Sequence, residues 1–203
     1  MSVRSKLALT ASAALVAAAT LTASGNATAS GPATSARAGA TYVVLKGGAT
    51  TLRLNPGTAK VLTDNGISVA PASEARVRST GIAFPIQGGL LNSKTLAGKV
   101  KHSGGLTFSA GGKDLTIRDF TINTAKKTLS AYVDEAGARI PVLNLNLAKA
   151  KVTKKHLTVS NVKAKLTSGA ASALNSYYST SLFKGGLKIG TATMSASSKI
   201  LRG

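Results

Sequence analysis

Short segments in which apolar and polar residues alternate recur along most of the chain, and they restrict the fold more than any other feature. In residues 143–147, leucine alternates with asparagine, the pattern of a strand with one buried face. Such segments follow one another about every 8–12 residues, with breaks that contain glycine or asparagine. This spacing is typical of an antiparallel sandwich, barrel or rolled sheet. We therefore expect a mainly β protein, an antiparallel sandwich or rolled sheet of about 9–11 strands.

Two segments change phase part-way along. In residues 115–122 the apolar residues fall first on odd-numbered and then on even-numbered positions, so one regular strand cannot bury them all. The phase change predicts a β-bulge at Arg118-Asp119. Val159 and Val162 are separated by the same kind of break, which predicts a second bulge at Ser160-Asn161.

Two segments that break the β pattern resemble each other. Residues 54–63 and 166–175 both read Leu-x-x-Gly-x-Ala-x-x-Leu followed by a small polar residue. Each lies between an alternating strand and a strand that begins with glycine, which predicts a strand–helix–strand unit at both ends of a β meander. Chance similarity in a chain rich in Ala, Thr and Ser is the alternative explanation.

Capping residues mark where the two helices begin. Asn55 can cap the first helix, with Pro56 at its first position, and Thr167 or Ser168 can cap the second. We expect two short helices, at about residues 56–65 and 168–178.

The first residues of the chain predict export. Arg4 and Lys6 precede the uncharged apolar run 7–21, and Ala27-Thr28-Ala29 offers the small-x-small pattern of a cleavage site. We expect a signal peptide at 1–29, because the apolar run is shorter than the roughly 20 residues of a membrane anchor, the alternative. A flexible lead-in (30–40) and one β-rich domain (41–203) should follow, in a protein that is secreted or held in the cell wall.

The chain offers little chemistry for catalysis. It has no cysteine, which removes disulfides, thiolate nucleophiles and cysteine metal ligands, and it has two histidines, His102 and His156. No Gly-x-Ser-x-Gly elbow or phosphate-binding loop is present. We therefore expect neither an enzyme nor a metal site.

Basic residues far outnumber acidic ones. The chain has 26 Lys and Arg against 6 Asp and Glu, a net charge of +20, and no acidic residue follows Glu135. Such a field attracts polyanions such as wall phosphopolymers, anionic lipid headgroups or nucleic acid, although it can equally serve solubility alone. With four Tyr, four Phe and no Trp, sequence-specific recognition of nucleic acid is not expected. The candidate polyanion patch consists of Lys149, Lys151, Lys154, Lys155, Lys163 and Lys165.

The central part of the chain carries a family resemblance. Phe84-Pro85-Ile86, the segment 98–106 (Gly-Lys-Val-Lys-His-Ser-Gly-Gly-Leu) and the segment 115–120 (Leu-Thr-Ile-Arg-Asp-Phe) follow one another within residues 82–133. In this order they resemble the core of HtaA-type domains, which are secreted or surface β-rich modules of actinobacteria associated with haem uptake. The resemblance covers about a quarter of the chain.

The resemblance implies haem as a candidate ligand and His102 as a candidate site residue. In the family a histidine lies in a Gly-His-x-Gly-like turn, and here Lys101 precedes His102 where glycine is favoured. The family's amino-terminal segment with Trp-Gly and a haem-ligating tyrosine has no counterpart, so Tyr42 and Tyr132 are the nearest stand-ins. His102 could brace a tyrosinate ligand, or it could simply end a strand and form local hydrogen bonds.

From these observations we expect a non-enzymatic binding module of HtaA-like type, with haem as a candidate ligand. The alternative is a basic structural or adhesive protein that binds anionic cell-wall polymers. The sequence leaves the oligomeric state open.

Overall fold

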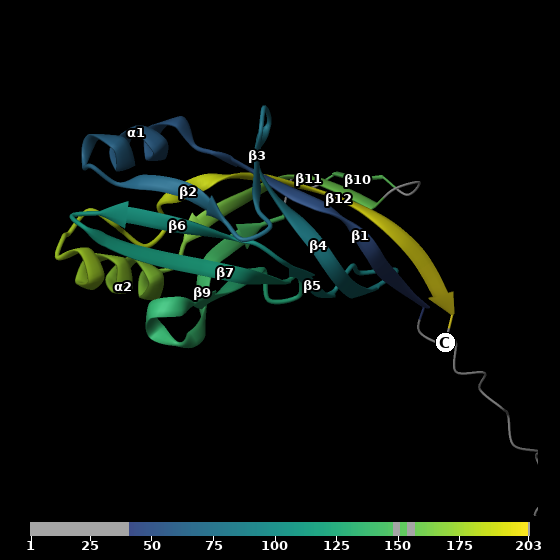
Figure 1. The fold of residues 1–203 in the computed structure, drawn as a ribbon. Coiled ribbons are helices and arrows are strands. Elements are labelled where there is room, and N and C mark those ends of the chain that lie inside the picture. Colours follow the sequence, from purple (N-terminus) through teal and green to yellow (C-terminus); the bar gives the residue numbers. More distant parts are fainter. Residues whose placement is uncertain (1–40, 148–150, 154–156, 203) are drawn as a thin grey trace, which may run out of the picture. The chain divides into compact units, whose positions relative to one another are not determined.

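The computed structural model of the protein describes residues 41–147, 151–153 and 157–202. The predicted signal peptide (1–29) and lead-in (30–40) lie outside these residues. Within them the chain forms one antiparallel sheet of 12 strands and two α-helices (Figure 1), which confirms the mainly β fold and exceeds the predicted 9–11 strands. In chain order the elements are β1 (Thr41–Leu54), α1 (Pro56–Asp64), β2 (Ser68–Ala72), β3 (Arg76–Arg78), β4 (Gly81–Asn92), β5 (Gly98–His102), β6 (Gly105–Ala110), β7 (Lys113–Asn123), β8 (Thr128–Val133), the 3-10 turn η1 (Asp134–Ala136), β9 (Ala138–Asn146), β10 (Lys151–Thr153), β11 (Leu157–Leu166), α2 (Ser168–Tyr178) and β12 (Lys188–Arg202).

Eight of the strands close into a barrel. Their order around the ring is β7-β5-β4-β1-β12-β11-β9-β8, and β8 pairs with β7 again. Closure turns one face of every strand toward a shared interior and leaves these strands without a free sheet edge. The structure is thus a closed barrel, which is more specific than the predicted sandwich or rolled sheet. Alternation of apolar and polar residues identifies strands, but it does not show whether the two edge strands of a sheet pair with each other and close it into a barrel. The remaining strands are additions: β6 pairs with β7 and β2 with β6, β3 pairs with β4, and β10 pairs with β11.

The strands have the phase that the sequence pattern predicts. Leu145 on β9 is buried and Asn144 is exposed. Both predicted bulges are confirmed, because the pairing shifts register between Arg118 and Thr121 and again between Val159 and Val162. At the bulges Asp119 has φ 54° and Asn161 has φ 63°, the left-handed region that Asp and Asn adopt more readily than most residues.

Both helices begin at side-chain caps. The Asn55 side chain accepts a hydrogen bond from the Thr58 amide at 3.2 Å, and α1 starts at Pro56. Thr167 rather than Ser168 caps α2, since its hydroxyl accepts from the Ala170 amide at 3.1 Å. The predicted helices are confirmed, and α1 ends one residue earlier than expected, at Asp64. The two helices lie at one end of the barrel, and β12 finishes at the other end (Figure 1). No helix in the described residues is long and apolar enough to cross a membrane.

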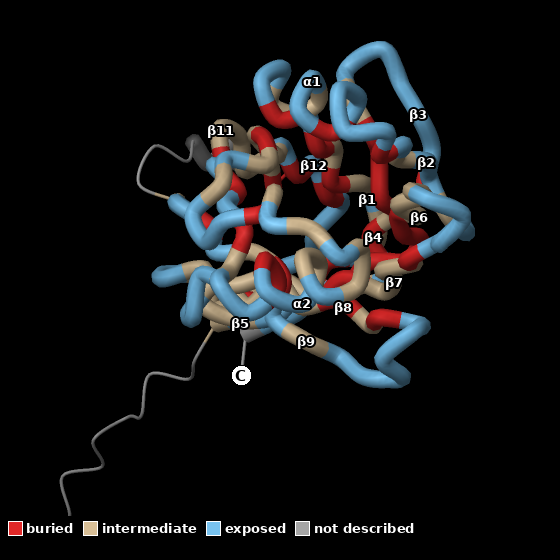
Figure 2. The backbone as a smooth tube through the Cα atoms, turned by 90° about the vertical axis from the view of Figure 1, so that its left-hand side faces the viewer, coloured by how far each residue is buried: buried red, intermediate tan, exposed pale blue. Residues whose placement is uncertain are grey.

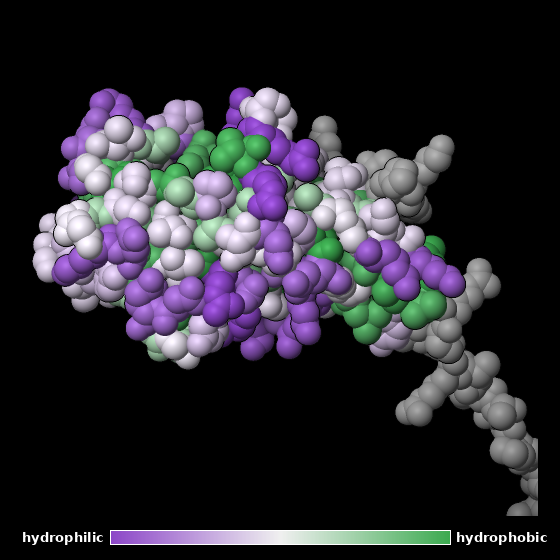
Figure 3. Space-filling view, viewed as in Figure 1, coloured by the Kyte–Doolittle hydropathy of each residue, from purple (hydrophilic) through white to green (hydrophobic). Residues whose placement is uncertain are grey.

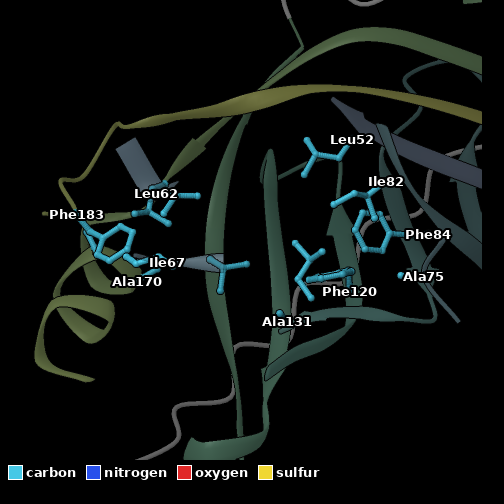
Figure 4. Packing of buried hydrophobic residues seen from close by; sticks show 14 residues of the cluster. Leu52, Leu62, Ile67, Ala75, Ile82, Phe84, Phe120, Ala131, Ala170 and Phe183 are labelled. Atoms are coloured by element: carbon cyan, nitrogen blue, oxygen red, sulfur yellow. The ribbon is translucent and has the colours of Figure 1, made fainter. Parts of the chain in front are cut away.

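The hydrophobic core lines the inside of the barrel and continues under the helices. Figure 2 shows buried segments within the strands and helices, and exposed segments at many of the turns and along parts of the helices. The largest cluster combines Phe84 and Phe120, whose rings pack edge to face with centroids 5.0 Å apart, with Leu62 of α1 and Ala170 of α2 (Figure 4). The helices therefore close one end of the barrel with apolar side chains.

Candidate functional site

An apolar cavity of about 430 Å³ lies inside the barrel. Inward-facing side chains of the strands line it, including Leu52, Phe84 and Phe120 (Figure 4), and α2 contributes Ala170. Among the described residues, no charged side chain and no tyrosine takes part in the lining. The lining residues with polar side chains are Thr50, Thr58, Thr95, His102 and Thr124.

His102, the last residue of β5, is the one titratable side chain that lines this cavity among the described residues. It is 2% exposed, and its Nε2 lies 2.7 Å from the Thr50 hydroxyl on β1. Its Nδ1 is buried and has no hydrogen-bond partner in the described part of the chain. Burial lowers the pKa of His102 to about 4, and a hydrogen-bond interaction with the Phe120 backbone opposes this shift without reaching the geometry of a full hydrogen bond to Nδ1. The imidazole is therefore neutral at neutral pH, with one nitrogen held and the other available.

The Gly-Gly turn after His102 explains its position. Gly104 has φ +79°, and a Cβ there would lie 2.4 Å from the Ala75 backbone nitrogen. A Cβ on Gly105 would lie 2.3 Å from the Ile117 carbonyl oxygen. Only glycine lets the chain pass this closely between β7 and the segment before β3. The hydrogen bond of His102 is also not local, since its partner Thr50 is 52 residues away.

Neither candidate tyrosine lines the cavity with His102. Tyr132 of β8 is paired with Arg118 of β7, whose guanidinium lies 4.8 Å from the centre of the tyrosine ring. Tyr42 lies near the start of β1, 37% exposed and opposite Leu201.

Two cavity residues escaped the sequence reasoning. Thr50 is the partner of His102, and Met194 of β12 is buried directly opposite Thr50 in the β1–β12 register. The position of Met194 among threonines and serines in an alternating strand is a sequence signal for inward burial. The pairing of Thr50 with His102 has no local signal, because strand closure creates it.

The structure describes only part of the candidate polyanion patch. Lys163 and Lys165 are exposed on β11, where the Lys163 ammonium donates to the Thr191 hydroxyl at 3.0 Å and Lys165 lies opposite Lys188 of β12. Lys151 lies in β10, but its side chain is outside the described part. The other three residues, Lys149, Lys154 and Lys155, lie outside the described residues.

The barrel wall around Lys163 and Lys165 carries only positive charge. Strands β1, β12, β11 and β9 contain no Asp or Glu, and exposed Arg53 on β1 lies opposite Thr191, the hydrogen-bond partner of Lys163. The described residues contain no cluster of His, Asp and Glu that could hold a metal ion.

Comparison with known proteins identifies the family. The family model HtaA, described as Htaa, matches residues 22–182. This chain belongs to the HtaA family. The match confirms the resemblance read from residues 82–133 and extends it over most of the chain. No curated protein matches the chain.

Solved structures of HtaA-type proteins from Corynebacterium glutamicum are similar to this barrel. The C-terminal domain of HtaA is 15% identical, with 77% of this chain and 99% of that chain covered and a TM-score of 0.61, so the fold is shared. The heme binding protein HtaB is 14% identical over 79% of this chain and 97% of that chain, with a TM-score of 0.49. The N-terminal domain of HtaA is 14% identical over 75% of this chain and 98% of that chain, with a TM-score of 0.49.

Proposed function

We propose that this HtaA-family protein is a non-catalytic binding module that takes haem into the barrel cavity, with His102 beside the iron. The observation that carries the proposal is the buried Nδ1 of His102, which lacks a partner at the wall of an apolar cavity. A buried polar atom without a partner costs about 1–3 kcal/mol, which a ligand bond would recover. The association of HtaA-type domains with haem uptake supports haem as that ligand.

The state of His102 suits an iron ligand. Neutral imidazole is a common haem ligand, and a pKa lowered to about 4 means that protons do not compete for it at neutral pH. The Thr50 hydroxyl can accept from or donate to Nε2, so this hydrogen bond holds the ring in either tautomer. In the tautomer in which Nε2 donates, Nδ1 carries the lone pair that an iron ligand needs. No tyrosinate is needed in this arrangement, in contrast to the role that the family resemblance implies.

The cavity suits the body of a porphyrin better than its charged groups. Its volume of about 430 Å³ is in the usual range for ligand pockets, roughly 300–1,000 Å³, and its lining is almost entirely aliphatic and aromatic. Since no charged side chain of the described residues lines it, the propionates should remain at a solvent-exposed end. The Met194 thioether is a second side chain of the lining that can ligate iron.

Titration of the purified protein with haem tests the proposal. We expect a Soret band that saturates at one equivalent. His102→Ala should weaken binding about tenfold or more or shift the band, whereas His156→Ala should do neither. Metal-free protoporphyrin should bind more weakly than haem and be insensitive to His102→Ala. Equal behaviour of the two histidine variants toward haem would remove His102 from the site.

Met194→Leu distinguishes one protein ligand from two. The substitution keeps the volume and removes the sulfur, so the fold should tolerate it. If Met194 binds iron, the spectrum changes while metal-free protoporphyrin binds as before. An unchanged spectrum would leave His102 as the one protein ligand to iron.

A second candidate function, binding of anionic cell-wall polymers, is favoured by the acid-free wall of β1, β12, β11 and β9. Retention on purified wall and on a heparin-like matrix should fall steeply between about 50 and 200 mM salt, because neutralised phosphates release counterions. Replacing the six lysines of the candidate patch by glutamine should lower retention. If retention is insensitive to salt and to these substitutions, the positive charge serves solubility and does not bind wall polymers.

A further inference from the structure

An apolar patch lies on the outer face of the barrel, at the end away from the helices. It consists of Tyr42 and Val44 of β1, Leu90 of β4 and Leu201 of β12. Tyr42 lies opposite Leu201 and Val44 lies opposite Leu90, and directly paired residues share a face of the sheet. Tyr42 is 37%, Leu90 50% and Leu201 46% exposed. Figure 3 shows the apolar area at this end of the molecule.

The fold itself does not require these four side chains. The neighbouring residues along the strands, Val43, Leu45 and Leu91, point inward and pack in the core, with Leu91 only 1% exposed. A barrel wall needs apolar residues on its inner face, whereas water usually selects polar residues on the outer one. Contiguous exposed apolar side chains commonly mark an interaction surface.

Lysines flank the apolar patch in the same register. Lys199 of β12 lies opposite Val44, and Lys99 of β5 lies opposite Leu90, so the row across the four strands reads Lys199–Val44–Leu90–Lys99. Both lysines are exposed. Strands β12, β1, β4 and β5 contain no acidic residue, and the turn between β4 and β5 adds exposed Lys94.

We propose that this apolar patch and its flanking lysines dock on an anionic lipid surface. Tyrosine and aliphatic side chains are suited to the boundary between headgroups and acyl chains. Lysines beside them can extend their ammonium groups to lipid phosphates, which the absence of carboxylates on these strands favours. The tyrosine and the aliphatic side chains of the patch lie beside one another on one face of the sheet. Together they can contact a flat surface such as a bilayer. This function is independent of the proposed haem site, whose residues face the interior.

Vesicle co-sedimentation tests the proposal with protein that lacks the predicted signal peptide, because the apolar run 7–21 would itself bind lipid. We expect binding to vesicles of equal parts phosphatidylglycerol and phosphatidylcholine and little binding to phosphatidylcholine alone. The paired substitutions Leu90→Ser/Leu201→Ser and Lys99→Gln/Lys199→Gln should each weaken binding at least tenfold.

A charge-matched control separates docking at this face from general attraction. Lys184→Gln/Lys188→Gln removes the same charge from two exposed lysines at the other end of the barrel, where β12 begins, and should leave vesicle binding within twofold of the unsubstituted protein. All three variants should keep the same far-UV circular dichroism and the same response to haem as the unsubstituted protein. The proposal is overturned if that protein does not bind the anionic vesicles, which would point to a protein partner. Equal loss in the control variant, or no loss in the leucine variant, would equally overturn it.

Discussion

At the residue scale, His102 combines two features that rarely occur together without a function. It is buried among apolar side chains, and it makes one hydrogen bond where its ring has two nitrogens to satisfy. The Thr50 hydroxyl limits its rotation, and the cavity beside it is large enough for a ligand. A histidine with a purely structural role would be expected to find a second partner within the core.

The burial of His102 predicts a loss of stability at mildly acidic pH. Its pKa is lowered from 6.5 to about 4, so between these values the unfolded chain binds a proton that the folded protein does not. The neutral His102 side chain therefore contributes to the free energy of unfolding in full above pH 6.5. This contribution decreases as the pH falls toward 4, by an amount on the order of 3 kcal/mol. Urea denaturation at about pH 7 and pH 4.5 measures it.

Variants assign this pH dependence to one side chain. His102→Leu should flatten the dependence in this range, while His156→Leu should leave it as steep as in the unsubstituted protein. A His102→Leu variant that loses as much stability as the unsubstituted protein would show that carboxylates, and not this imidazole, dominate the acid response.

Sequence reasoning reached part of the site. His102 could be selected because a Gly-Gly turn and a family-like motif mark it locally. Thr50 could not, because its position follows from a hydrogen bond across 52 residues. The alternating strand signals that Met194 is buried, but its place opposite Thr50 follows from the pairing of β1 with β12. Tyr42 and Tyr132 were selected by residue type alone, and the geometry of the strands separates them from the cavity lining.

At the scale of elements, periodicity and capping predict what is local. The bulges at Asp119 and Asn161 follow from a change of phase within one strand, and the helix starts follow from Asn55 and Thr167. Strand order and closure are set by pairs such as β7 with β8, whose partners are chosen by the whole chain. Hence the strands could be predicted and the closed barrel could not.

Strand β9 provides a direct test of the inward phase. Leu145 is 7% exposed and packs in the core, so Leu145→Ala should cost about 2–5 kcal/mol of stability through lost burial and the cavity that remains. Asn144 is exposed, and Asn144→Ala should change stability by no more than about 0.5 kcal/mol. Chemical denaturation of both variants gives the difference, and equal costs would contradict the assigned phase.

At the scale of the whole molecule, the net charge agrees with the predicted export. A net charge of +20 suits a protein that meets anionic surfaces outside the cell, and the segment before the barrel has the pattern of a signal peptide. We expect the mature protein to begin at Ser30. Amino-terminal sequencing of the extracellular form checks this, and an intact Met1 in the membrane fraction would contradict it.

The central claim is that haem binds inside the barrel beside His102, and a crystal structure of the haem-saturated protein tests it most directly. The account predicts haem within the apolar cavity, with its iron bonded to Nδ1 of His102 and Nε2 still hydrogen-bonded to Thr50. Haem bound on the outer face of the barrel, or iron ligated by Tyr42 or Tyr132, would contradict it.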